Sequence, residues 1–327
     1  MRGPVGWGVI PTTSAVAQEA VLPAIAASPK AQLVAVASRS APPDTFGARR
    51  VYHRYDSLLE DPDVEIVYLA LPNHLHAEWT TRAAAAGKHV LCEKPLGRSG
   101  PEAEAMAAAC RRAGVVLAEA YMTPFHPRSA LMADIVRSGR LGPLEFAHAA
   151  FTTVLGRPGN HRWRPDAGGG ALLDLGVYVV APLLAAAGGR SPAAVAGAAR
   201  MTESGVDVSC SAWLDFGHGF SATVECSFDA PERQLLEIVG RDAALRLTHN
   251  AFTPAADDRA VTLIGRDGAA TPVTWDGGGE PAPTTYRAMV EHLCAAVRDG
   301  ATLGRPPEEA VAVLAVLDRI RDAAGMA

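Results

Sequence analysis

Short apolar runs alternate with stretches of helical composition through the first part of this chain. The apolar runs cover residues 5–10, 33–37, 66–71 and 89–92, and the helical stretches include 14–27 and 78–86. A strand, helix, strand order repeated at this spacing is typical of parallel βαβ units, because parallel strands need a crossover between them. A further helix over 102–114 and a strand over 115–121 continue the pattern. The sequence therefore predicts an α/β fold in which residues 1–123 form a doubly wound parallel sheet.

The pattern changes after residue 125, where strands follow one another without intervening helices. Strands are expected at 144–154, 206–216, 219–227, 235–239 and 261–264, and helices at 170–187, 286–298 and 307–324. Adjacent strands without crossover helices indicate an antiparallel or mixed sheet. A chain of 327 residues is long enough for two domains. Residues 124–327 are therefore expected to form a second α/β domain with a largely antiparallel, open-faced sheet.

The composition excludes several classes of partner. The formal net charge is -5 and the arginines are spread among acidic residues, so the basic stripe of a nucleic-acid-binding protein is missing. The apolar runs are too short to cross a bilayer, and five separated cysteines without a C-x-x-C pair favour reduced thiols. The N-terminal segment enters a strand without a signal-like run. We expect a cytoplasmic protein whose partners are small molecules, with no nucleic acid and no membrane among them.

The turn after the first strand, GVIPTTSAVA, stands where a dinucleotide fold carries its glycine-rich phosphate loop. Gly8 alone remains of that fingerprint, and Thr12, Thr13 and Ser14 occupy the turn. Small hydroxyl side chains donate hydrogen bonds to phosphate, Ser14 is a good N-cap residue, and a helix N-terminus attracts anions. These four residues are therefore candidates for the cofactor site of a Rossmann domain. An ordinary capped turn between strand and helix is the alternative.

Ser38 and Arg39 follow the second strand, where such folds meet the adenosine ribose of the cofactor. An acidic residue there would bind the ribose diol of NAD, whereas hydroxyl and guanidinium groups donate to the oxygens of a 2′-phosphate. The pair therefore favours NADP(H) as the cofactor. The alternative is that Arg39 is an ordinary solvated side chain.

Lysine is rare in this chain, and its positions are informative. Of the 30 lysines and arginines, only Lys30, Lys88 and Lys94 are lysines. An ammonium group in an apolar or cationic site can exchange its proton near neutral pH, whereas a guanidinium stays charged. Lys94, in VLCEKPLG, is therefore a candidate for proton chemistry. Lys30 and Lys88, which lie in expected surface turns, show that a lysine is also retained by chance.

The helix expected at 170–187 is apolar on all sides and therefore buried. Asp174 and Tyr178 lie four residues apart on one face of it, and buried polar groups are costly unless they have partners. Gly176 between them weakens the helix by about 1 kcal/mol, which predicts that another element packs closely against this turn. The two polar residues form either a hydrogen-bonded structural pair or part of a catalytic site.

Two loops carry weaker signals. His74 and His76 form an H-x-H pair of the kind that ligates zinc, but no third ligand cluster accompanies it, and no metal is expected. In GNHRWRP, arginines flank Trp163. Guanidinium groups receive phosphate well, and a solvated loop is the alternative. The arginines of this region are Arg157, Arg162 and Arg164.

Four motifs resemble, in order and spacing, the Gfo/Idh/MocA family of nicotinamide oxidoreductases: LPNHLHAEW, AGKHVLCEKPLG, EAYMTPFHP and GGGALLDLGVY. The similarity extends over nearly the whole chain and includes ECSFDAPERQLLEIVG in the second domain. It implies an N-terminal Rossmann domain followed by a substrate-binding and oligomerisation domain. The E-K-P sequence is the most diagnostic of these motifs.

The resemblance also implies roles for individual residues. Lys94 is expected beside the nicotinamide and the reacting carbon, with a cis bond to Pro95. Tyr178 is expected to donate the proton, Lys94 to tune and orient it, and Asp174 to hold a substrate hydroxyl or the lysine; Lys94 itself is the alternative donor. Glu93 is expected to orient or pair with the lysine. The other expected contacts are Leu71, Pro72, His76, Glu93, Lys94, Trp163 and Arg164 with the cofactor, and Lys94, Tyr121 and Arg162 with the substrate.

Tyrosine at the last position of the family's D-x-x-x-H/Y motif resembles the deoxysugar 3-ketoreductases and glucose-fructose oxidoreductase. The expected activity is NADP(H)-dependent hydride transfer to or from a sugar, most specifically reduction of a nucleotide-linked keto-deoxysugar of secondary metabolism. A dehydrogenase of a free sugar, cyclitol or dihydrodiol is one alternative, and a non-catalytic cofactor-sensing or scaffolding homologue is another. By analogy with the family, we expect a homodimer or homotetramer that pairs through the exposed face of the second sheet.

Overall fold

The computed structural model describes residues 3–39, 45–156, 159–275 and 284–326, and the chain divides into two compact units. The first unit combines Met1–Phe125 with Pro283–Val311, and the second combines His126–Ala282 with Ala312–Ala327. The expected boundaries, 1–123 and 124–327, differ from this division mainly in the segment after residue 283. That segment joins the first unit because its helix packs there. The segment DGGGEPAPTT, residues 276–285, has the glycine- and proline-rich sequence of a linker, and its residues 276–283 lie outside the described part of the chain.

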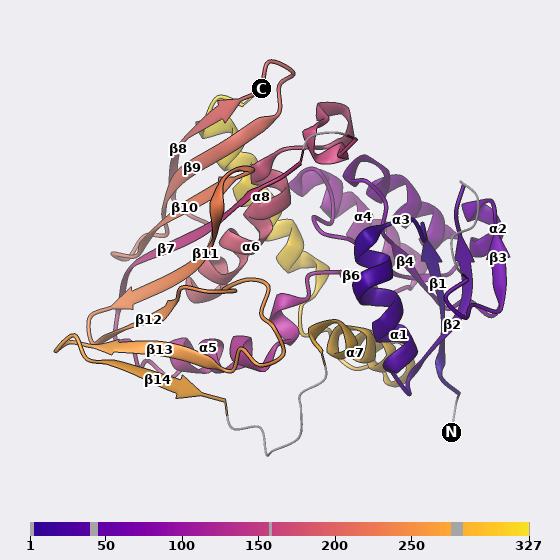
Figure 1. Ribbon diagram of the computed structural model, residues 1–327, viewed down its shortest axis with the longest axis horizontal. Helices are drawn as coiled ribbons and strands as arrows, with labels where there is room; N and C mark the ends of the chain where they lie inside the picture. Colours follow the sequence, from indigo (N-terminus) through magenta and orange to yellow (C-terminus); the bar gives the residue numbers. More distant parts are fainter. Residues whose placement is uncertain (1–2, 40–44, 157–158, 276–283, 327) are drawn as a thin grey trace. The chain divides into compact units, whose positions relative to one another are not determined.

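A six-stranded parallel sheet forms the centre of the first unit, with the strand order β3-β2-β1-β4-β5-β6. The order reverses direction between β1 and β4, which is the topological switch point of a doubly wound fold (Figure 1). Its strands are β1 (Val5–Ile10), β2 (Ala31–Ala37), β3 (Arg50–Tyr52), β4 (Ile66–Leu69), β5 (His89–Cys92) and β6 (Leu117–Glu119). Its helices are η1 (Ala17–Val21), α1 (Leu22–Ala27), α2 (Tyr55–Leu59), η2 (Asn73–Leu75), α3 (His76–Ala85), α4 (Gly100–Ala113), η3 (Thr123–Phe125) and α7 (Thr285–Asp299).

The core of this unit follows from strands that are apolar on both faces. Every residue of β1 and β4 is buried, as expected for central parallel strands covered by helices on two sides. Helix α1 packs with α7, and α3 packs with α4. The indole of Trp7 is fully buried and donates to Cys294 Sγ in α7 at 3.4 Å. The last turn of α7 is also fixed there, because Arg298 Nη2 donates to Glu65 Oε1 at 2.6 Å.

The second unit is built on an eight-stranded sheet with the order β14-β13-β12-β11-β7-β10-β9-β8. All neighbouring strands are antiparallel except β7 and β10. Its strands are β7 (Leu144–Val154), β8 (Ala194–Met201), β9 (Asp207–Asp215), β10 (Ser221–Ser227), β11 (Asp229–Gly240), β12 (Ala243–Leu247), β13 (Ala260–Gly265) and β14 (Ala270–Thr274). Its helices are α5 (Pro127–Arg137), η4 (His161–Trp163), η5 (Pro165–Ala167) and α6 (Ala171–Ala186), and α8 (Pro307–Ala323) begins in the first unit and ends in the second.

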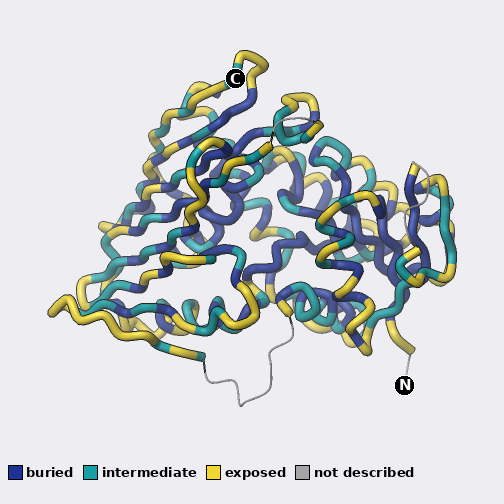
Figure 2. The backbone as a smooth tube through the Cα atoms, viewed as in Figure 1, coloured by how far each residue is buried: buried dark blue, intermediate teal, exposed yellow. Residues whose placement is uncertain are grey.

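One face of this sheet is covered by helix α6, which packs on β7, β9 and β10. Buried and exposed residues alternate along its strands (Figure 2), so the other face is open. Phe146 and Trp213 are exposed on their strands, whereas Leu214 next to Trp213 is fully buried. The two sheets together confirm the predicted fold class, a doubly wound parallel sheet followed by a largely antiparallel open-faced sheet.

Several local features differ from expectation. The helix expected at 14–27 contains a π-helical turn, η1, before α1. Strands β3, β8, β12 and β14 and helices α2 and α5 have no counterpart among the expected elements. Lys88 does not lie in a surface turn: it is buried, and Nζ donates to the carbonyl oxygens of Asp61 at 2.7 Å and Val64 at 2.9 Å. Within the described parts of the chain, no helix combines the length and apolar character needed to cross a membrane.

Candidate functional site

Most of the predicted cofactor residues of the first unit lie in turns at one edge of its sheet, near the switch point between β1 and β4. Because all six strands are parallel, their carboxyl ends share an edge. The turn after β1 carries Thr12, Thr13 and Ser14, and the turn after β4 carries Leu71 and Pro72. Residues after β2, β5 and β6 extend the row: Ser38, Arg39, Glu93, Lys94 and Tyr121. Ligands of open α/β sheets bind outside the carboxyl ends of the strands at this point.

The turn after β1 presents its hydroxyl groups unequally. Thr12 is buried, and its carbonyl accepts a hydrogen bond from Gln18 Nε2 at 2.7 Å. Thr13 is exposed and Ser14 is half-buried. The carbonyl of Ser14 accepts from the Gln18 amide at 3.1 Å, which places Ser14 at the N-cap position of the helical segment. Thr13 and Ser14 are therefore the hydroxyl groups best placed to meet an anion at this helix N-terminus.

Gly8 lies within β1 rather than in the turn. A Cβ at this position would come within 2.7 Å of Leu58 Cδ2 and 3.0 Å of Val64 Cγ1. The glycine is therefore needed for close packing inside the first unit. A direct contact between Gly8 and the cofactor stays a prediction.

Ser38 and Arg39, the residues predicted to meet the adenosine ribose, directly follow β2. Ser38 is buried, and its amide donates to the Tyr52 carbonyl at 3.1 Å. Arg39 is exposed, with its guanidinium carbon 5.4 Å from the centroid of the Tyr55 ring. A hydroxyl and a cation, with no carboxylate at these two positions, suit a 2′-phosphate better than a ribose diol.

The turn that carries Lys94 follows β5 and contains a cis bond between Lys94 and Pro95, as the resemblance implies. Glu93 is buried, and its carboxylate accepts from the Tyr68 hydroxyl at 2.6 Å and from the Lys94 backbone amide at 3.1 Å. Burial, together with the charge of Glu93, raises the pKa of Tyr68 well above its ordinary value. Glu93 therefore fixes the backbone of Lys94, whose side chain is half-buried.

His76 joins the turn after β5 to the turn after β4. Its ring is fully buried, with Nδ1 2.9 Å from the Pro95 carbonyl oxygen and Nε2 2.8 Å from the Leu71 carbonyl oxygen. Burial lowers the pKa of this imidazole. Because both ring nitrogens face backbone carbonyl groups, His76 acts as a brace between the two turns and is not oriented as a zinc ligand. No group of three histidine, cysteine or acidic residues is arranged to hold a metal within the described ranges.

A buried ion pair, Glu119 with Arg305, also holds the turn that carries Lys94. Glu119 Oε1 accepts from the Leu96 amide at 2.9 Å, and Glu119 Oε2 pairs with Arg305 Nη2 at 2.8 Å. The two side chains are 2% and 6% exposed. Arg305 also lies over the ring of Tyr121, with its guanidinium carbon 4.4 Å from the ring centroid. Burial raises the pKa of Tyr121 to about 12.

Sequence reasoning did not identify Glu119 or Arg305. Glu119 is an isolated acidic residue in an apolar strand, VLAEAY, and this signal could have marked it as a buried charge that needs a partner. Arg305 gives no comparable signal, because it is one of many arginines and lies far from Glu119 in the sequence. Tyr121, predicted to contact substrate, is covered by Arg305 on one side of its ring.

Helix α6 positions Asp174 and Tyr178 in the second unit. Its first turn is capped by the buried Asp207, whose Oδ2 accepts from the Leu172 amide at 2.7 Å. Burial raises the pKa of this Asp207 carboxyl. Gly170 precedes the helix with φ 125°, and a Cβ there would lie 2.0 Å from Asp207 Oδ1. The predicted close neighbour of Gly176 is confirmed as Leu317, whose Cδ2 would lie 2.7 Å from an added Cβ.

Asp174 has a partner that the sequence did not indicate. Arg162 Nε lies 3.0 Å from Asp174 Oδ2, so these two predicted substrate residues form an ion pair. Tyr178 is buried, and its ring and that of Phe151 meet edge to face at a centroid distance of 5.3 Å. Arg162 therefore holds Asp174 one helical turn before the phenol.

The other residues of the segment GNHRWRP are arranged differently. Trp163 Nε1 donates to the Gly156 carbonyl at 3.2 Å, and its ring lies 5.3 Å from that of Phe228. Arg164 is exposed and pairs with the exposed Asp166, with 3.1 Å between Arg164 Nε and Asp166 Oδ1. An exposed pair of this kind contributes little stability, so Arg164 is available to an anionic ligand. Arg157 lies outside the described residues.

Comparison with known proteins places these observations in a family. Residues 5–121 match the model of an oxidoreductase family with an NAD-binding Rossmann fold, Gfo/Idh/MocA, and residues 130–246 match its C-terminal domain. A dTDP-3,4-didehydro-2,6-dideoxy-α-D-glucose 3-reductase of Streptomyces violaceoruber is 38% identical over 94% of this chain and 92% of its own length. A D-xylose 1-dehydrogenase (NADP(+)) of Haloferax volcanii is 36% identical over 95% of both chains.

Solved structures agree with the family models. KijD10, a 3-ketoreductase from Actinomadura kijaniata in complex with NADP and TDP-benzene, has a TM-score of 0.88 and 31% identity, with 98% of both chains covered. The aldose-aldose oxidoreductase of Caulobacter crescentus has a TM-score of 0.86 and 26% identity over the same shares. The chain therefore belongs to the Gfo/Idh/MocA family of oxidoreductases.

Proposed function

We propose that this protein transfers a hydride between NADP(H) and a sugar, and that its substrate is a nucleotide-linked keto-deoxysugar that it reduces to the alcohol. The observation that carries the proposal is the arrangement on α6, where Asp174 and Tyr178 lie one turn apart and Arg162 pairs with Asp174. A carboxylate and a phenol on a capped, buried helix provide an acceptor for a substrate hydroxyl and a donor for a carbonyl oxygen.

NADPH supplies the hydride when it is bound. Thr13, Ser14 and Arg39 would hold its phosphates, as their positions at the carboxyl edge of the sheet favour. Tyr178 would donate its phenolic proton to the carbonyl oxygen, which becomes the hydroxyl of the product. Lys94 would orient the phenol and carry the positive charge that favours phenolate once the proton has left. Asp174, fixed by Arg162, would accept a hydrogen bond from a neighbouring substrate hydroxyl.

Two relatives support different substrates almost equally. The Streptomyces violaceoruber protein is named as a reductase of a dTDP-linked keto sugar, and the Haloferax volcanii protein as a dehydrogenase of D-xylose. KijD10 supports the first choice, because its structure contains a TDP derivative and NADP. The exposed Arg164 supports it as well, since a free sugar has no phosphate for a guanidinium to bind.

The first experiment measures both cofactors and both substrate classes. We expect NADPH to bind more tightly than NADH, and cofactor fluorescence measures both affinities. We expect dTDP-linked keto sugars to oxidise bound NADPH, and the absorbance of the reduced nicotinamide measures this reaction. Tyr178→Phe should lower kcat by about 100-fold or more, the range for loss of a general acid. Tyr52→Phe makes the same change at the edge strand β3 and serves as the matched control.

Other outcomes would contradict parts of the proposal. Oxidation of D-xylose or a cyclitol with NADP⁺, without reduction of any keto sugar, would replace the ketoreductase with a free-sugar dehydrogenase. Failure to bind either cofactor at millimolar concentration would favour a non-catalytic homologue. A preference for NADH would remove the role given to Ser38 and Arg39.

The expected homodimer or homotetramer is part of the proposal. The open face of the second sheet supports it, because Phe146 is 54% exposed and Trp213 42% exposed on neighbouring parts of that face. Exposed aromatic side chains on a sheet face are typical of protein interfaces.

A further inference from the structure

Three aromatic rings form a row that ends at Tyr178, the proposed proton donor. The Phe151 and Tyr178 rings meet edge to face with 5.3 Å between centroids and an interplanar angle of 68°. Phe151 also stacks with Phe252, at a centroid distance of 5.7 Å and an interplanar angle of 23°. Phe151 comes from β7, Tyr178 from α6 and Phe252 from the loop after β12. Because all three rings are buried, a change in the position of one ring displaces the next.

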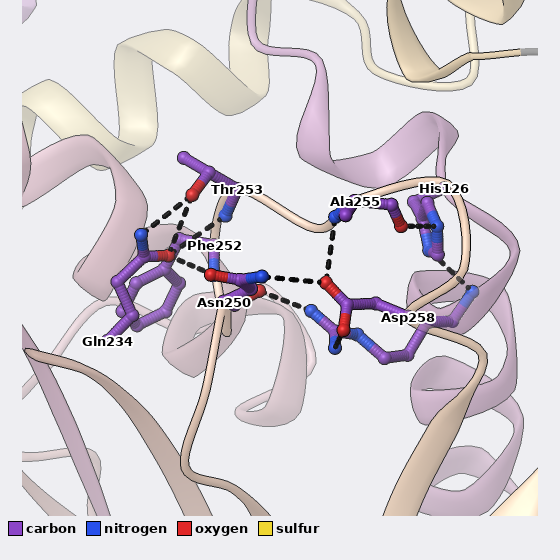
Figure 3. Close-up of polar contacts among 8 residues, drawn as sticks. His126, Gln234, Asn250, Phe252, Thr253, Ala255 and Asp258 are labelled. Atoms are coloured by element: carbon purple, nitrogen blue, oxygen red, sulfur yellow. Dashed lines mark hydrogen bonds and ion pairs between the residues drawn. The ribbon is translucent and has the colours of Figure 1, made fainter.

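A buried glutamine holds the backbone of Phe252. Gln234, in β11, is the register partner of Phe151 in β7, and its side chain is buried. Gln234 Oε1 accepts hydrogen bonds from the backbone amides of Phe252 and Thr253, both at 3.0 Å, and Gln234 Nε2 lies 2.7 Å from Thr253 Oγ1 (Figure 3). The same side chain therefore lies opposite Phe151 and holds the backbone that carries its stacking partner.

The far end of this loop is fixed independently. Asp258 Oδ2 accepts from Asn250 Nδ2 at 3.0 Å and from the Ala255 amide at 2.8 Å. The buried Arg128 of α5 donates to the Asn250 carbonyl. His126 Nδ1 accepts from the Arg128 amide at 3.1 Å, and its Nε2 lies 3.1 Å from the Ala255 carbonyl oxygen (Figure 3). The loop is thus anchored near Asn250, Ala255 and Asp258 by contacts that do not involve Gln234, and Gln234 bonds the backbone next to the ring row.

We infer that Gln234 is a positioning residue for the proposed reaction: through Phe252 and Phe151 it fixes the ring of Tyr178. The inference rests on the proposed function, in which Tyr178 donates the proton. Its physical basis is that a proton donor must stay within hydrogen-bonding reach of the carbonyl oxygen, so a shift of the phenol lowers the rate more than it weakens binding.

The test compares matched substitutions in two stacked phenylalanine pairs of the second unit. Phe252→Leu removes one ring of the row. Phe220→Leu removes one ring of the Phe216–Phe220 pair, which has a centroid distance of 5.3 Å and an interplanar angle of 21° in the turn between β9 and β10. Phe252 is 1% exposed and Phe220 3% exposed, so both changes remove a buried ring. Phe252 is a member of the row, and Phe220 belongs to a separate stacked pair.

Gln234 is tested by a second pair. Gln234→Leu leaves the buried amide of Phe252 and the partly buried amide of Thr253 without their acceptor. Gln234→Glu keeps an oxygen acceptor for both amides and can accept from the Thr253 hydroxyl, so it should rescue the effect. This pair decides the question even if Phe252→Leu does not yield folded protein.

We expect Phe252→Leu and Gln234→Leu to lower kcat by about tenfold, with KM for the keto sugar and Kd for NADPH within about twofold of the unchanged protein. Phe220→Leu and Gln234→Glu should keep kcat within about twofold. Equal loss of kcat in Phe252→Leu and Phe220→Leu would overturn the inference, because it would reflect packing of the unit as a whole. Failure of Gln234→Glu to restore kcat would overturn the role of the glutamine.

A second readout does not depend on activity. The chain has six tyrosines, so incorporation of 3-fluorotyrosine gives few ¹⁹F resonances, and Tyr178→Phe identifies that of Tyr178. Phe252→Leu and Gln234→Leu should shift or broaden this resonance, and Phe220→Leu should not. If the unchanged protein reduces no keto sugar, the proposed function fails while this measurement still decides the inference. An unmoved Tyr178 resonance in both variants would overturn it whatever the activity.

Discussion

Lys88 is held by two backbone carbonyl groups in a geometry that suits an ammonium. Lys88 lies just before β5, and its Nζ donates to the carbonyl oxygens of Asp61 at 2.7 Å and Val64 at 2.9 Å. Both carbonyl groups belong to the loop between α2 and β4. Burial lowers the pKa of this lysine, and the nearby carboxylates of Asp61 and Glu65 oppose that effect. The compact lysine ammonium, with three N–H donors, fits between the two carbonyl groups. The planar guanidinium of arginine is larger and directs its donors differently.

Replacing Lys88 by arginine should therefore destabilise the protein although the charge is kept. We expect Lys88→Arg to lower the free energy of unfolding by about 1–3 kcal/mol, the usual cost when a buried group loses its partners. Lys30→Arg makes the same change at an exposed position and should stay within about 0.5 kcal/mol. Urea unfolding of the three proteins measures both values, and equal stability of Lys88→Arg and Lys30→Arg would contradict the argument.

At single positions, sequence reasoning succeeds where one residue conflicts with its local environment. Gly176 in an apolar helix predicts a close neighbour, and Leu317 is that neighbour. It fails where a partner comes from a distant segment. Neither the ion pair of Asp174 with Arg162 nor the burial of Lys88 can be derived from spacing, because each depends on how separate segments pack. The proposed catalytic roles of Lys94 and Tyr178 stay predictions.

Among the elements, the turn between β5 and α4 is held by side chains from three other segments. His76 contacts the carbonyl of Pro95, and Glu119 accepts from the amide of Leu96. Arg305, just before α8, compensates the charge of Glu119. The turn that carries Lys94 thus depends on an ion pair that is bonded to its backbone at Leu96.

Removing the cation of this pair should loosen the turn. Arg305→Met leaves the Glu119 carboxylate buried without compensation, and we expect a loss of about 3–5 kcal/mol in the free energy of unfolding. Arg305→Lys should recover part of this loss. Arg111→Met is the matched control, because Arg111 pairs with Glu104 and Glu308 at the surface of the same unit and such pairs contribute about 1 kcal/mol or less. Similar losses in Arg305→Met and Arg111→Met, measured by urea unfolding, would refute this account.

The prediction of elements from the sequence depends on how distinct their patterns are. Strands β1 and β4 are short and wholly apolar, β5 is apolar after His89, and α6 is apolar on most sides, so the sequence predicts all four near their observed bounds. Strand β8 has the sequence AVAGAARM at the edge of its sheet, where alanine and glycine give little strand signal. Helix α5 begins with Pro127 and buries few residues, so its apolar stripe is weak.

For the whole molecule, the return of residues 283–311 to the first unit has no signal in the sequence order. The chain leaves this unit after Phe125 and contributes α7 to it more than 150 residues later. Trp7 contacts Cys294, and Glu65 contacts Arg298, across most of the chain. Because of these contacts, the first unit is built from two segments that are far apart in the sequence. A single domain boundary, such as the expected one at residue 123, cannot describe it.

The ion pair of Glu65 with Arg298 should make the stability of the first unit depend on pH. Burial alone raises the pKa of Glu65, but hydrogen bonds from Arg298 and from the Gly6 amide, together with the charge of Arg298, bring it below its ordinary value of 4.5. A carboxyl whose pKa is lower in the folded state stabilises that state above its ordinary pKa. This stabilisation is lost as the pH falls from about 4.5 through the folded-state pKa.

Glu65→Gln should therefore reduce the free energy of unfolding at pH 7 by about 1 kcal/mol, a value limited by partial exposure of the pair. The difference from the unchanged protein should shrink as the pH is lowered below about 4.5, because the unchanged carboxyl is then protonated as well. Urea unfolding at pH 7, 4 and 3 would measure it, with the exposed Glu60→Gln as control. A difference that stays constant across this range would show that Glu65 acts through packing and not through its charge.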